Sequence, residues 1–98
     1  MGFDTNADIE KFYANRFALR DVVKIGGKSY LVSTVELPPS PYGAPYETMI
    51  FDANEDGGAA NYIERYCDRY DTQEEAQQGH AHALTLSVDN LYPNYGEE

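Results

Sequence analysis

Two glycines that separate two β-prone runs constrain the fold of this chain more than any other feature. Residues 22–25 read Val-Val-Lys-Ile, residues 26–27 are the glycines, and residues 28–35 read Lys-Ser-Tyr-Leu-Val-Ser-Thr-Val. Glycine accepts the positive φ angles of the two-residue turns that join antiparallel strands. Such a turn places Val23 opposite Tyr30. Leu31 and Val35 then share one face of the second strand, and apolar side chains also occupy its other face. The sequence therefore predicts a tight β-hairpin that is covered in part on both sides.

A second pair of strands is predicted beyond a proline-rich loop. Four prolines within residues 38–45 remove backbone donors and favour an extended path, so this segment leaves the sheet as a loop that exposes Tyr42. Residues 46–51, Tyr-Glu-Thr-Met-Ile-Phe, are predicted to form the third strand, which the turn-rich residues 52–58 end. Residues 62–70 fit a helix by the spacing of their apolar side chains and a strand by their alternating tyrosines. We interpret them as the fourth strand.

Helices are predicted at the two ends of the chain. Thr5 can cap a helix over residues 6–18, in which apolar side chains recur at the three-and-four spacing of one face. Near the other end, Thr72 and Glu75 have the spacing of a capping box, in which each side chain accepts a hydrogen bond from the backbone amide of the other residue. The helix that this box opens is predicted to extend to about Asn90, and residues 92–98 are predicted to fray.

These elements define an α+β fold. An N-terminal helix is followed by an antiparallel sheet of about four strands in two hairpins, and a C-terminal helix packs on that sheet. A chain of 98 residues builds one hydrophobic core and not two, so residues 1–98 are predicted to form a single domain. A composition with 42% apolar residues is sufficient for such a core.

The formal net charge of −10 is concentrated in one part of the chain. Residues 1–35 carry a charge of +1, whereas residues 36–98 carry thirteen carboxylates against two arginines, Arg65 and Arg69. An acidic surface repels phosphate backbones, which argues against direct nucleic-acid binding, and it attracts basic protein surfaces. The alternative is that the acidic surface only keeps a small protein in solution. Composition leaves both interpretations open.

Cys67, His80 and His82 are the side chains that could suggest metal or nucleophilic chemistry. The two histidines are two residues apart on a predicted helix, so they point in different directions and cannot chelate one ion. Cys67 and His80 could serve as nucleophile and base, but the sequence names no third group to orient them. We therefore expect no cofactor, no metal and no catalytic site, and we interpret His80 as a packed, hydrogen-bonded residue. Gly79 lowers helix propensity, which indicates a close approach of the helix to the sheet.

Tyrosines alternate with carboxylates around the predicted fourth strand, a pattern suited to protein contact. Tyrosine supplies rigid contact area, and the carboxylates supply charge. A row of carboxylates along paired strands can also imitate the phosphate spacing of a nucleic-acid duplex. The predicted partner-binding residues are Glu47, Asp52, Glu55, Asp56, Tyr62, Glu64, Tyr66, Asp68, Tyr70 and Asp71. The alternative interpretation is a solvated outer face with half-packed tyrosines.

Two stretches of the chain resemble a pattern in small proteins of phages, prophages and other bacterial mobile elements. The first is residues 46–51, and the second is residues 69–80, Arg-Tyr-Asp-Thr-Gln-Glu-Glu-Ala-Gln-Gln-Gly-His. With the variable turn between them they cover about a third of the chain. The resemblance implies a mobile-element origin and carries no particular reaction with it.

The leading hypothesis from the sequence is a non-enzymatic, phage-type acidic protein that binds and inhibits a basic, nucleic-acid-handling host protein. A CRISPR or restriction effector is such a target, which would make the chain an anti-CRISPR or anti-restriction inhibitor and a DNA mimic. One cysteine forms no internal disulfide and no apolar run has the length of a membrane span, so we expect the host cytoplasm as its location. The alternatives are a small enzyme or metal protein centred on Cys67 and His80, and a phage structural or assembly component.

Overall fold

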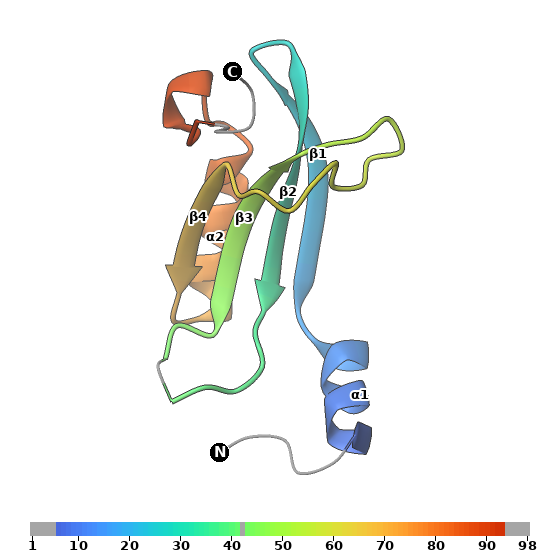
Figure 1. Cartoon of the computed structure of the whole chain (residues 1–98). Helices are drawn as coiled ribbons and strands as arrows, with labels where there is room; N and C mark the ends of the chain where they lie inside the picture. The colour runs from blue at the N-terminus through green and yellow to red at the C-terminus, as the bar shows by residue number, and fades with distance from the viewer. Residues whose placement is uncertain (1–5, 42, 94–98) are drawn as a thin grey trace.

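A four-stranded antiparallel sheet with one helix on one of its faces forms the body of the molecule (Figure 1). The computed structural model describes residues 6–41 and 43–93. Its elements are α1 (Asn6–Asn15), β1 (Ala18–Ile25), β2 (Lys28–Glu36), β3 (Tyr46–Asp52), β4 (Tyr66–Tyr70), α2 (Gln73–Ala83) and a short 3-10 helix (Val88–Asn90). The strands lie side by side in the order of the chain. The predicted α+β class, with two hairpins and a C-terminal helix on the sheet, is confirmed.

The glycine hairpin has the predicted register. Val23 lies opposite Tyr30, and the turn places Gly26 and Gly27 at φ angles of 61° and 84°. β1 nevertheless begins at Ala18, inside the stretch that we predicted to be helical, and α1 ends three residues earlier at Asn15. The reason is pairing across the hairpin, because β2 extends to Glu36 and offers partners to residues 18–21. Sheet pairing therefore overrides the local helical pattern. The predicted helix cap, Thr5, lies outside the described residues.

The core lies between the sheet and α2. Its fully buried members are Ile25, Tyr30, Val32, Ile50 and Ala83, and Val23, Tyr66, Leu84, Leu86 and Leu91 pack against them. On the opposite face of the sheet Leu31 is buried, and Tyr62 of the loop over residues 53–64 meets the Phe51 ring of β3 edge to face at 5.7 Å. Both faces are thus covered in part, as the hairpin pattern predicts. No helix of the described residues is long and apolar enough to cross a membrane.

The C-terminal helix is shorter than predicted. Thr72 and Glu75 form the predicted capping box, but α2 ends at Ala83 and does not continue to Asn90. A continuous helix would place Leu84 and Leu91 on one side and Leu86 on nearly the opposite side, since each residue turns the helix by about 100°. By leaving the helix after Ala83, the chain packs all three leucines on one core.

Two further predictions need correction near the fourth strand and the chain end. β4 begins at Tyr66, so residues 62–65 are not part of the strand, and Tyr62 is 85% exposed. Tyr92 does not fray: its amide donates to the Arg65 carbonyl at 2.6 Å, and its hydroxyl donates to the Cys67 carbonyl at 3.4 Å. Residues 94–98, the rest of the predicted frayed tail, and Tyr42 lie outside the described residues.

α1 stands apart from the core. It lies beyond the start of β1, at one end of the sheet (Figure 1). None of its residues is buried, and Ile9 and Tyr13 on its apolar face are 39% and 50% exposed. Phe17, just after the helix, is the side chain that reaches the body, where its ring meets Tyr46 edge to face at 5.9 Å. α1 therefore contributes little to the packing that holds the sheet together.

Candidate functional site

The ten predicted partner-binding residues fall into two groups by exposure. Glu55, Asp56, Tyr62, Glu64, Asp68 and Asp71 are exposed, Tyr66 and Tyr70 are half-buried, and Glu47 and Asp52 are buried. The two buried carboxylates lie on opposite faces of the sheet, because Glu47 and Asp52 are separated by an odd number of positions on β3. Each of them forms an ion pair with an arginine, so its first role is to hold the fold together and not to contact a partner.

Glu47 is neutralised from the neighbouring strand. Its Oε2 accepts a hydrogen bond from Arg69 Nε at 3.1 Å and lies 3.0 Å from Arg69 Nη2. The Cys67 thiol donates to the same oxygen at 3.7 Å. The register of β3 and β4 places Glu47 directly opposite Arg69, so this ion pair is a cross-strand pair.

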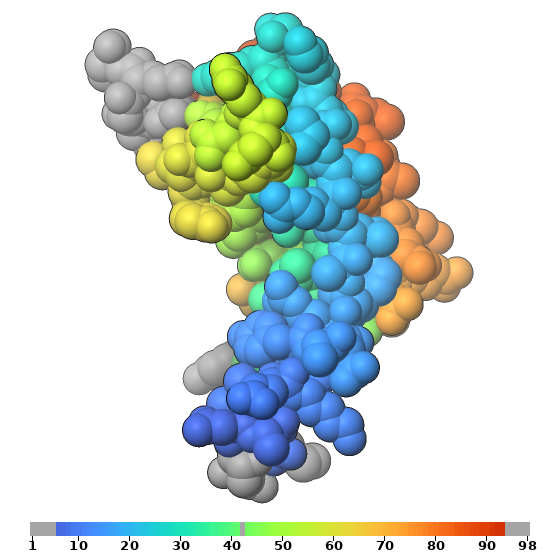
Figure 2. Space-filling view, turned by 90° about the vertical axis from the view of Figure 1, so that its right-hand side faces the viewer, coloured from blue at the N-terminus to red at the C-terminus, as the bar shows by residue number. Residues whose placement is uncertain are grey.

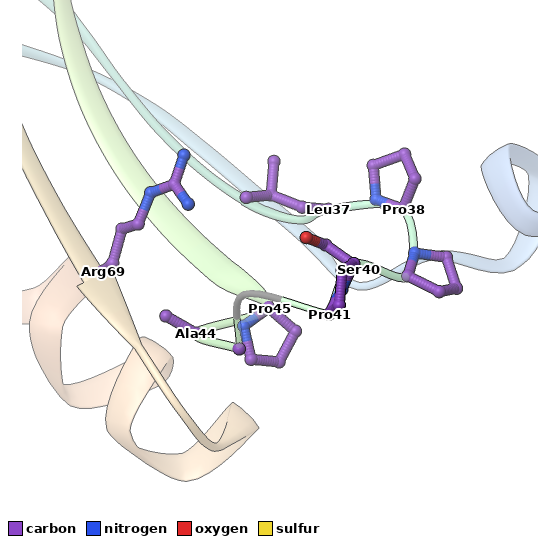
Figure 3. Close-up of a pocket in the computed structure, with 9 residues that line it drawn as sticks. Leu37, Pro38, Ser40, Pro41, Ala44, Pro45 and Arg69 are labelled. Atoms are coloured by element: carbon purple, nitrogen blue, oxygen red, sulfur yellow. The ribbon is translucent and has the colours of Figure 1, made fainter. Parts of the chain in front are cut away.

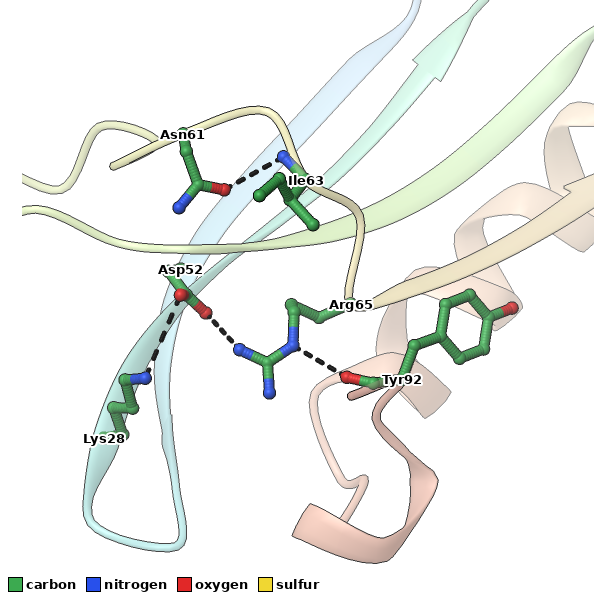
Figure 4. Close-up of polar contacts among 6 residues, drawn as sticks. All are labelled: Lys28, Asp52, Asn61, Ile63, Arg65 and Tyr92. Atoms are coloured by element: carbon green, nitrogen blue, oxygen red, sulfur yellow. Dashed lines mark hydrogen bonds and ion pairs between the residues drawn. The ribbon is translucent and has the colours of Figure 1, made fainter. Parts of the chain in front are cut away.

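Asp52 is neutralised from the loop before β4 (Figure 4). Arg65 Nη1 donates to Asp52 Oδ1 at 2.7 Å, and Arg65 Nε donates to the Tyr92 carbonyl at 2.8 Å. The guanidinium also lies 5.6 Å from the centre of the Tyr30 ring, which is within reach of a cation–π contact. Lys28 approaches the other carboxylate oxygen to 3.9 Å. Arg65 therefore links Asp52 of β3 to Tyr92. The arginine is only 8% exposed, so these contacts are shielded from solvent.

Among the described residues, these two pairs leave the other carboxylates after residue 35 without an arginine partner from the same part of the chain. Arg65 and Arg69 are the only basic residues in that part of the sequence, and both are committed to buried partners. Of the exposed predicted carboxylates, Asp68 lies in β4, which is an edge strand, Glu64 lies two residues before it, and Asp71 directly follows it. Glu74 adds a fourth in the first turn of α2. We call these four residues the acidic edge.

The structure does not bring all predicted residues to one face. Glu55 and Asp56 lie in the turn after β3, and the neighbouring Gly57 carbonyl accepts a hydrogen bond from Arg20 of β1 at 3.3 Å. β1 is the edge strand on the far side of the sheet from β4. Figure 1 shows the same loop crossing the sheet and projecting past β1. We call Glu55 and Asp56 the acidic turn. The acidic turn is separate from the acidic edge.

A hydrogen-bonded chain of five side chains joins every strand and α2. His80 Nε2 lies 2.7 Å from Asp21 Oδ2, and His80 Nδ1 lies 2.7 Å from Thr34 Oγ1. Thr34 Oγ1 lies 2.5 Å from Thr48 Oγ1, which accepts from the Tyr70 hydroxyl at 3.1 Å. The five residues come from β1, α2, β2, β3 and β4 respectively. The prediction that His80 is a packed, hydrogen-bonded residue is confirmed, since it is 4% exposed.

The direction of this chain follows from its two ends. The carboxylate of Asp21 only accepts, so Nε2 of His80 donates to it, and in the neutral imidazole with this tautomer Nδ1 accepts from Thr34. Thr34 then accepts from Thr48, and Thr48 accepts from Tyr70, so every hydroxyl donates once. Hydrogen bonds aligned in this way reinforce one another. Thr34 is 0% exposed, so its hydroxyl is out of reach of any substrate and the cluster is architectural.

Cys67 and His80 do not meet. Cys67 shares the face of Glu47, whereas His80 contacts Thr34 on the face that α2 covers. Burial and the negative charge of Glu47 raise the pKa of the Cys67 thiol to about 11, so the thiol is protonated at neutral pH. A nucleophilic cysteine needs the opposite shift. Across the described residues, no group of three or more His, Cys, Asp and Glu side chains is placed to hold a metal ion.

The proline-rich loop encloses a cavity of about 300 Å³ (Figure 3). It is lined by Leu37, Pro38, Pro39, Ser40, Pro41, Gly43, Ala44, Pro45 and Arg69. The guanidinium of Arg69 at its wall is already paired with Glu47. Most of the lining is proline and other apolar side chains, and its polar members are Ser40 and the paired Arg69.

The two stretches that carry the resemblance, residues 46–51 and 69–80, contact each other in the structure. Tyr46 lies opposite Tyr70, Glu47 pairs with Arg69, and Thr48 accepts from the Tyr70 hydroxyl. The conspicuous residues of the pattern are therefore those that fasten β3 to β4 and α2. Comparisons with protein-family models, with curated proteins and with solved structures give no match to this chain.

The contact between α2 and β4 accounts for the glycine at position 79. A Cβ atom on Gly79 would overlap the ring and hydroxyl of Tyr70, so the predicted close approach of helix and sheet is confirmed. We expect Gly79→Ala to lower the free energy of unfolding by about 1–3 kcal/mol, the usual cost of overpacking, although alanine is the better helix former. Urea unfolding measures this change. Gln78→Ala, at the exposed neighbour, is the control and should cause no loss.

A double variant locates the cause of that loss. Because Tyr70 is the side chain that meets the added methyl group, Tyr70→Ser combined with Gly79→Ala should cost less than the sum of the two single changes. Equal stability of Gly79→Ala and the wild type would show that the ring moves aside without cost, against our expectation.

Proposed function

We propose that this chain is a non-enzymatic, phage-type inhibitor that presents its acidic edge to a basic, nucleic-acid-handling host protein. The observation that carries the proposal is the internal use of both arginines after residue 35. Glu64, Asp68, Asp71 and Glu74 are exposed, and among the described residues neither Arg65 nor Arg69 forms an ion pair with any of them. A basic groove that holds a nucleic acid is complementary to such a row.

Tyrosines support the acidic edge as a contact surface. Tyr66 and Tyr70 alternate with Asp68 along β4 and are half-buried, so their rings are held in place while part of each remains accessible. Burial and, for Tyr66, the nearby charge of Asp68 raise the pKa of both phenols, which keeps them as neutral donors at physiological pH. Rigid aromatic residues beside charged ones are typical of the anchors of protein interfaces.

The outer backbone of β4 is already partly engaged. Tyr92 donates to the carbonyls of Arg65 and Cys67, which lie at the start of this edge strand. The proposed contact at the acidic edge therefore works through side chains and charge, and not through addition of a further strand. Binding of this kind weakens with ionic strength, because the Debye length falls from about 10 Å at 0.1 M salt to about 3 Å at 1 M.

Charge reversal on matched sites tests the proposal. Asp68→Lys/Asp71→Lys changes the charge of the acidic edge, and Glu55→Lys/Asp56→Lys makes the same change on the acidic turn. We expect the wild type and the acidic-turn variant to capture a host DNA- or RNA-binding protein from lysate and to reduce its nucleic-acid binding. The acidic-edge variant should lose at least about tenfold in affinity, equivalent to about 1.4 kcal/mol.

Two results would overturn the proposed function. One is capture that is unchanged by salt at about 0.5 M, where exposed charges are strongly screened. The other is equal loss of capture in the acidic-edge and acidic-turn variants, which would show that net charge alone, and not the acidic edge, governs binding. Retained folding of each variant is checked by its far-UV circular dichroism and urea midpoint.

A further inference from the structure

The outer edge of β1 is an open strand edge. Glu36 N donates to the Phe17 carbonyl at 2.9 Å, so the backbone groups of Phe17 point toward β2. Backbone direction alternates along a strand, and the outward residues are therefore Ala18, Arg20, Val22 and Lys24. Among the described residues, no backbone hydrogen bond outside the β1–β2 ladder reaches these four. β4, the other edge, differs because Tyr92 covers part of it.

The surroundings leave this edge accessible. Ala18, Arg20, Val22 and Lys24 are all exposed, and Val22 is 48% exposed. Figure 2 looks onto the side of the molecule where β1 lies and shows its residues running uncovered from α1 to the glycine hairpin, beside the loop over residues 53–64. The side chains of Arg20, Val22 and Lys24 share the sheet face on which the loop over residues 53–64 lies, and they place two cations on either side of a β-branched apolar residue. Arg20 makes one long hydrogen bond, to the Gly57 carbonyl at 3.3 Å.

These charges decide what can pair with β1. A second copy added antiparallel about Val22 would place Arg20 opposite Lys24 twice, and like charges directly opposite each other destabilise a strand pair. An acidic strand has the complementary sign. We propose that the open edge of β1 binds an extended acidic segment of a partner protein by strand addition, with acidic side chains opposite Arg20 and Lys24 and an apolar one opposite Val22.

The proposal defines a sequence pattern in the partner. Strand addition uses main-chain hydrogen bonds for affinity and alternate side chains for specificity. Arg20, Val22 and Lys24 lie at alternate positions of β1. The partner segment therefore needs five consecutive residues that are acidic, unrestricted, apolar, unrestricted and acidic, and this pattern is the same in both chain directions. The edge of β1 lies across the sheet from the acidic edge, so this interaction is independent of the proposed function.

Synthetic peptides test this site on the full chain. The probe is the blocked peptide Thr-Glu-Thr-Val-Thr-Glu-Thr, and the control replaces both glutamates with lysine. In two-dimensional NMR of the labelled protein, we expect the glutamate peptide to shift the amides of Ala18, Arg20, Val22 and Lys24. Hydrogen exchange of these amides should slow by about tenfold or more, since they gain hydrogen bonds. The lysine peptide should bind at least about tenfold more weakly.

A proline variant separates strand addition from simple charge attraction. Val22 directs its amide outward, so Val22→Pro removes a donor from the open edge without breaking the β1–β2 ladder. We expect Val22→Pro to keep the native NMR spectrum of β3 and α2 and to lose the glutamate peptide, whereas Val22→Thr keeps it. If Val22→Pro unfolds the chain, a glutamate peptide N-methylated at alternate positions gives the same test and should fail to bind.

Several outcomes would overturn the inference. Binding of the glutamate peptide that survives both Val22→Pro and N-methylation would mean attraction without strand pairing. Slow exchange of the four outward amides in the peptide-free protein at high concentration, together with a dimer in sedimentation, would mean that a second copy occupies the edge. The absence of any shift with the peptide at millimolar concentration would also exclude the site.

Discussion

Replacing Arg65 with methionine will lower the free energy of unfolding by about 3–5 kcal/mol, because it removes the guanidinium that pairs with a buried carboxylate. Asp52 is 8% exposed and would lose the hydrogen bond that Arg65 Nη1 donates to its Oδ1 at 2.7 Å. The Tyr92 carbonyl would also lose the Nε donor that reaches it at 2.8 Å. A domain of this size is typically stable by about 5–15 kcal/mol, so the variant will be close to unfolding at 37 °C. Urea denaturation followed by circular dichroism measures the change.

Three companion variants identify the cause. Arg65→Met/Asp52→Leu removes both charges and should recover much of the loss, because a buried pair replaced by apolar residues is often neutral or better. Arg65→Lys should stay destabilised, since one ammonium group cannot satisfy both Asp52 and the Tyr92 carbonyl as the guanidinium does. Arg20→Met, at an exposed arginine, should change stability by no more than about 0.5 kcal/mol. Similar losses in Arg65→Met and Arg20→Met would refute the structural role of Arg65.

Local backbone chemistry explains which parts of the fold the sequence predicts. Gly26 and Gly27 adopt the positive φ angles that the turn requires, and this two-residue turn sets the register of β1 and β2. Thr72 and Glu75 start α2 through hydrogen bonds that span three residues. Both signals act between neighbours in the chain, so they are readable without knowledge of what packs against them.

The misjudged features depend on contacts between distant residues. The end of α2 depends on Leu86 and Leu91 reaching the core, and the start of β1 depends on the length of β2. Glu47 and Asp52 look like surface carboxylates in the sequence, and only the approach of Arg69 and Arg65 buries them. The sequence contains one indication that Asp52 is buried. Thr48, Ile50 and Asp52 occupy alternate positions of β3 and therefore share the face that α2 covers. That alternation predicts an inward Asp52 once β3 is known to be central.

The separation of the acidic residues has the same origin. The sequence places Glu55, Asp56 and Glu64 within ten residues of one another, which suggests a single surface. The chain between them crosses the sheet from β1 to β4, so proximity along the sequence becomes separation across four strands. Conversely, Asp71 and Glu74 join Glu64 and Asp68 because β4 runs directly into α2. Charge counted along a chain locates a surface only when the path of the chain is known.

Replacing His80 with alanine will destabilise the fold by about 2–4 kcal/mol, although the residue takes part in no reaction. The loss combines a cavity beneath α2 with the buried Thr34 hydroxyl, which loses its acceptor at a cost of about 1–3 kcal/mol. His80 is the one side chain of the polar chain that links α2 to the sheet, through Asp21 and Thr34. Urea unfolding again gives the change, and His82→Ala, on the exposed side of the same helix, should stay within about 0.5 kcal/mol.

A double-mutant cycle shows whether the hydrogen bond itself carries this stability. Thr34→Val removes the donor to Nδ1 of His80, so the Thr34→Val/His80→Ala protein no longer leaves that donor without an acceptor. If the bond matters, the double variant will be at least about 1 kcal/mol more stable than the sum of the single losses predicts. Strict additivity would mean that His80 stabilises the fold only by filling space. In that case the five-residue chain would be a consequence of packing, and the fastening of β1 to α2 would have to come from the apolar core alone.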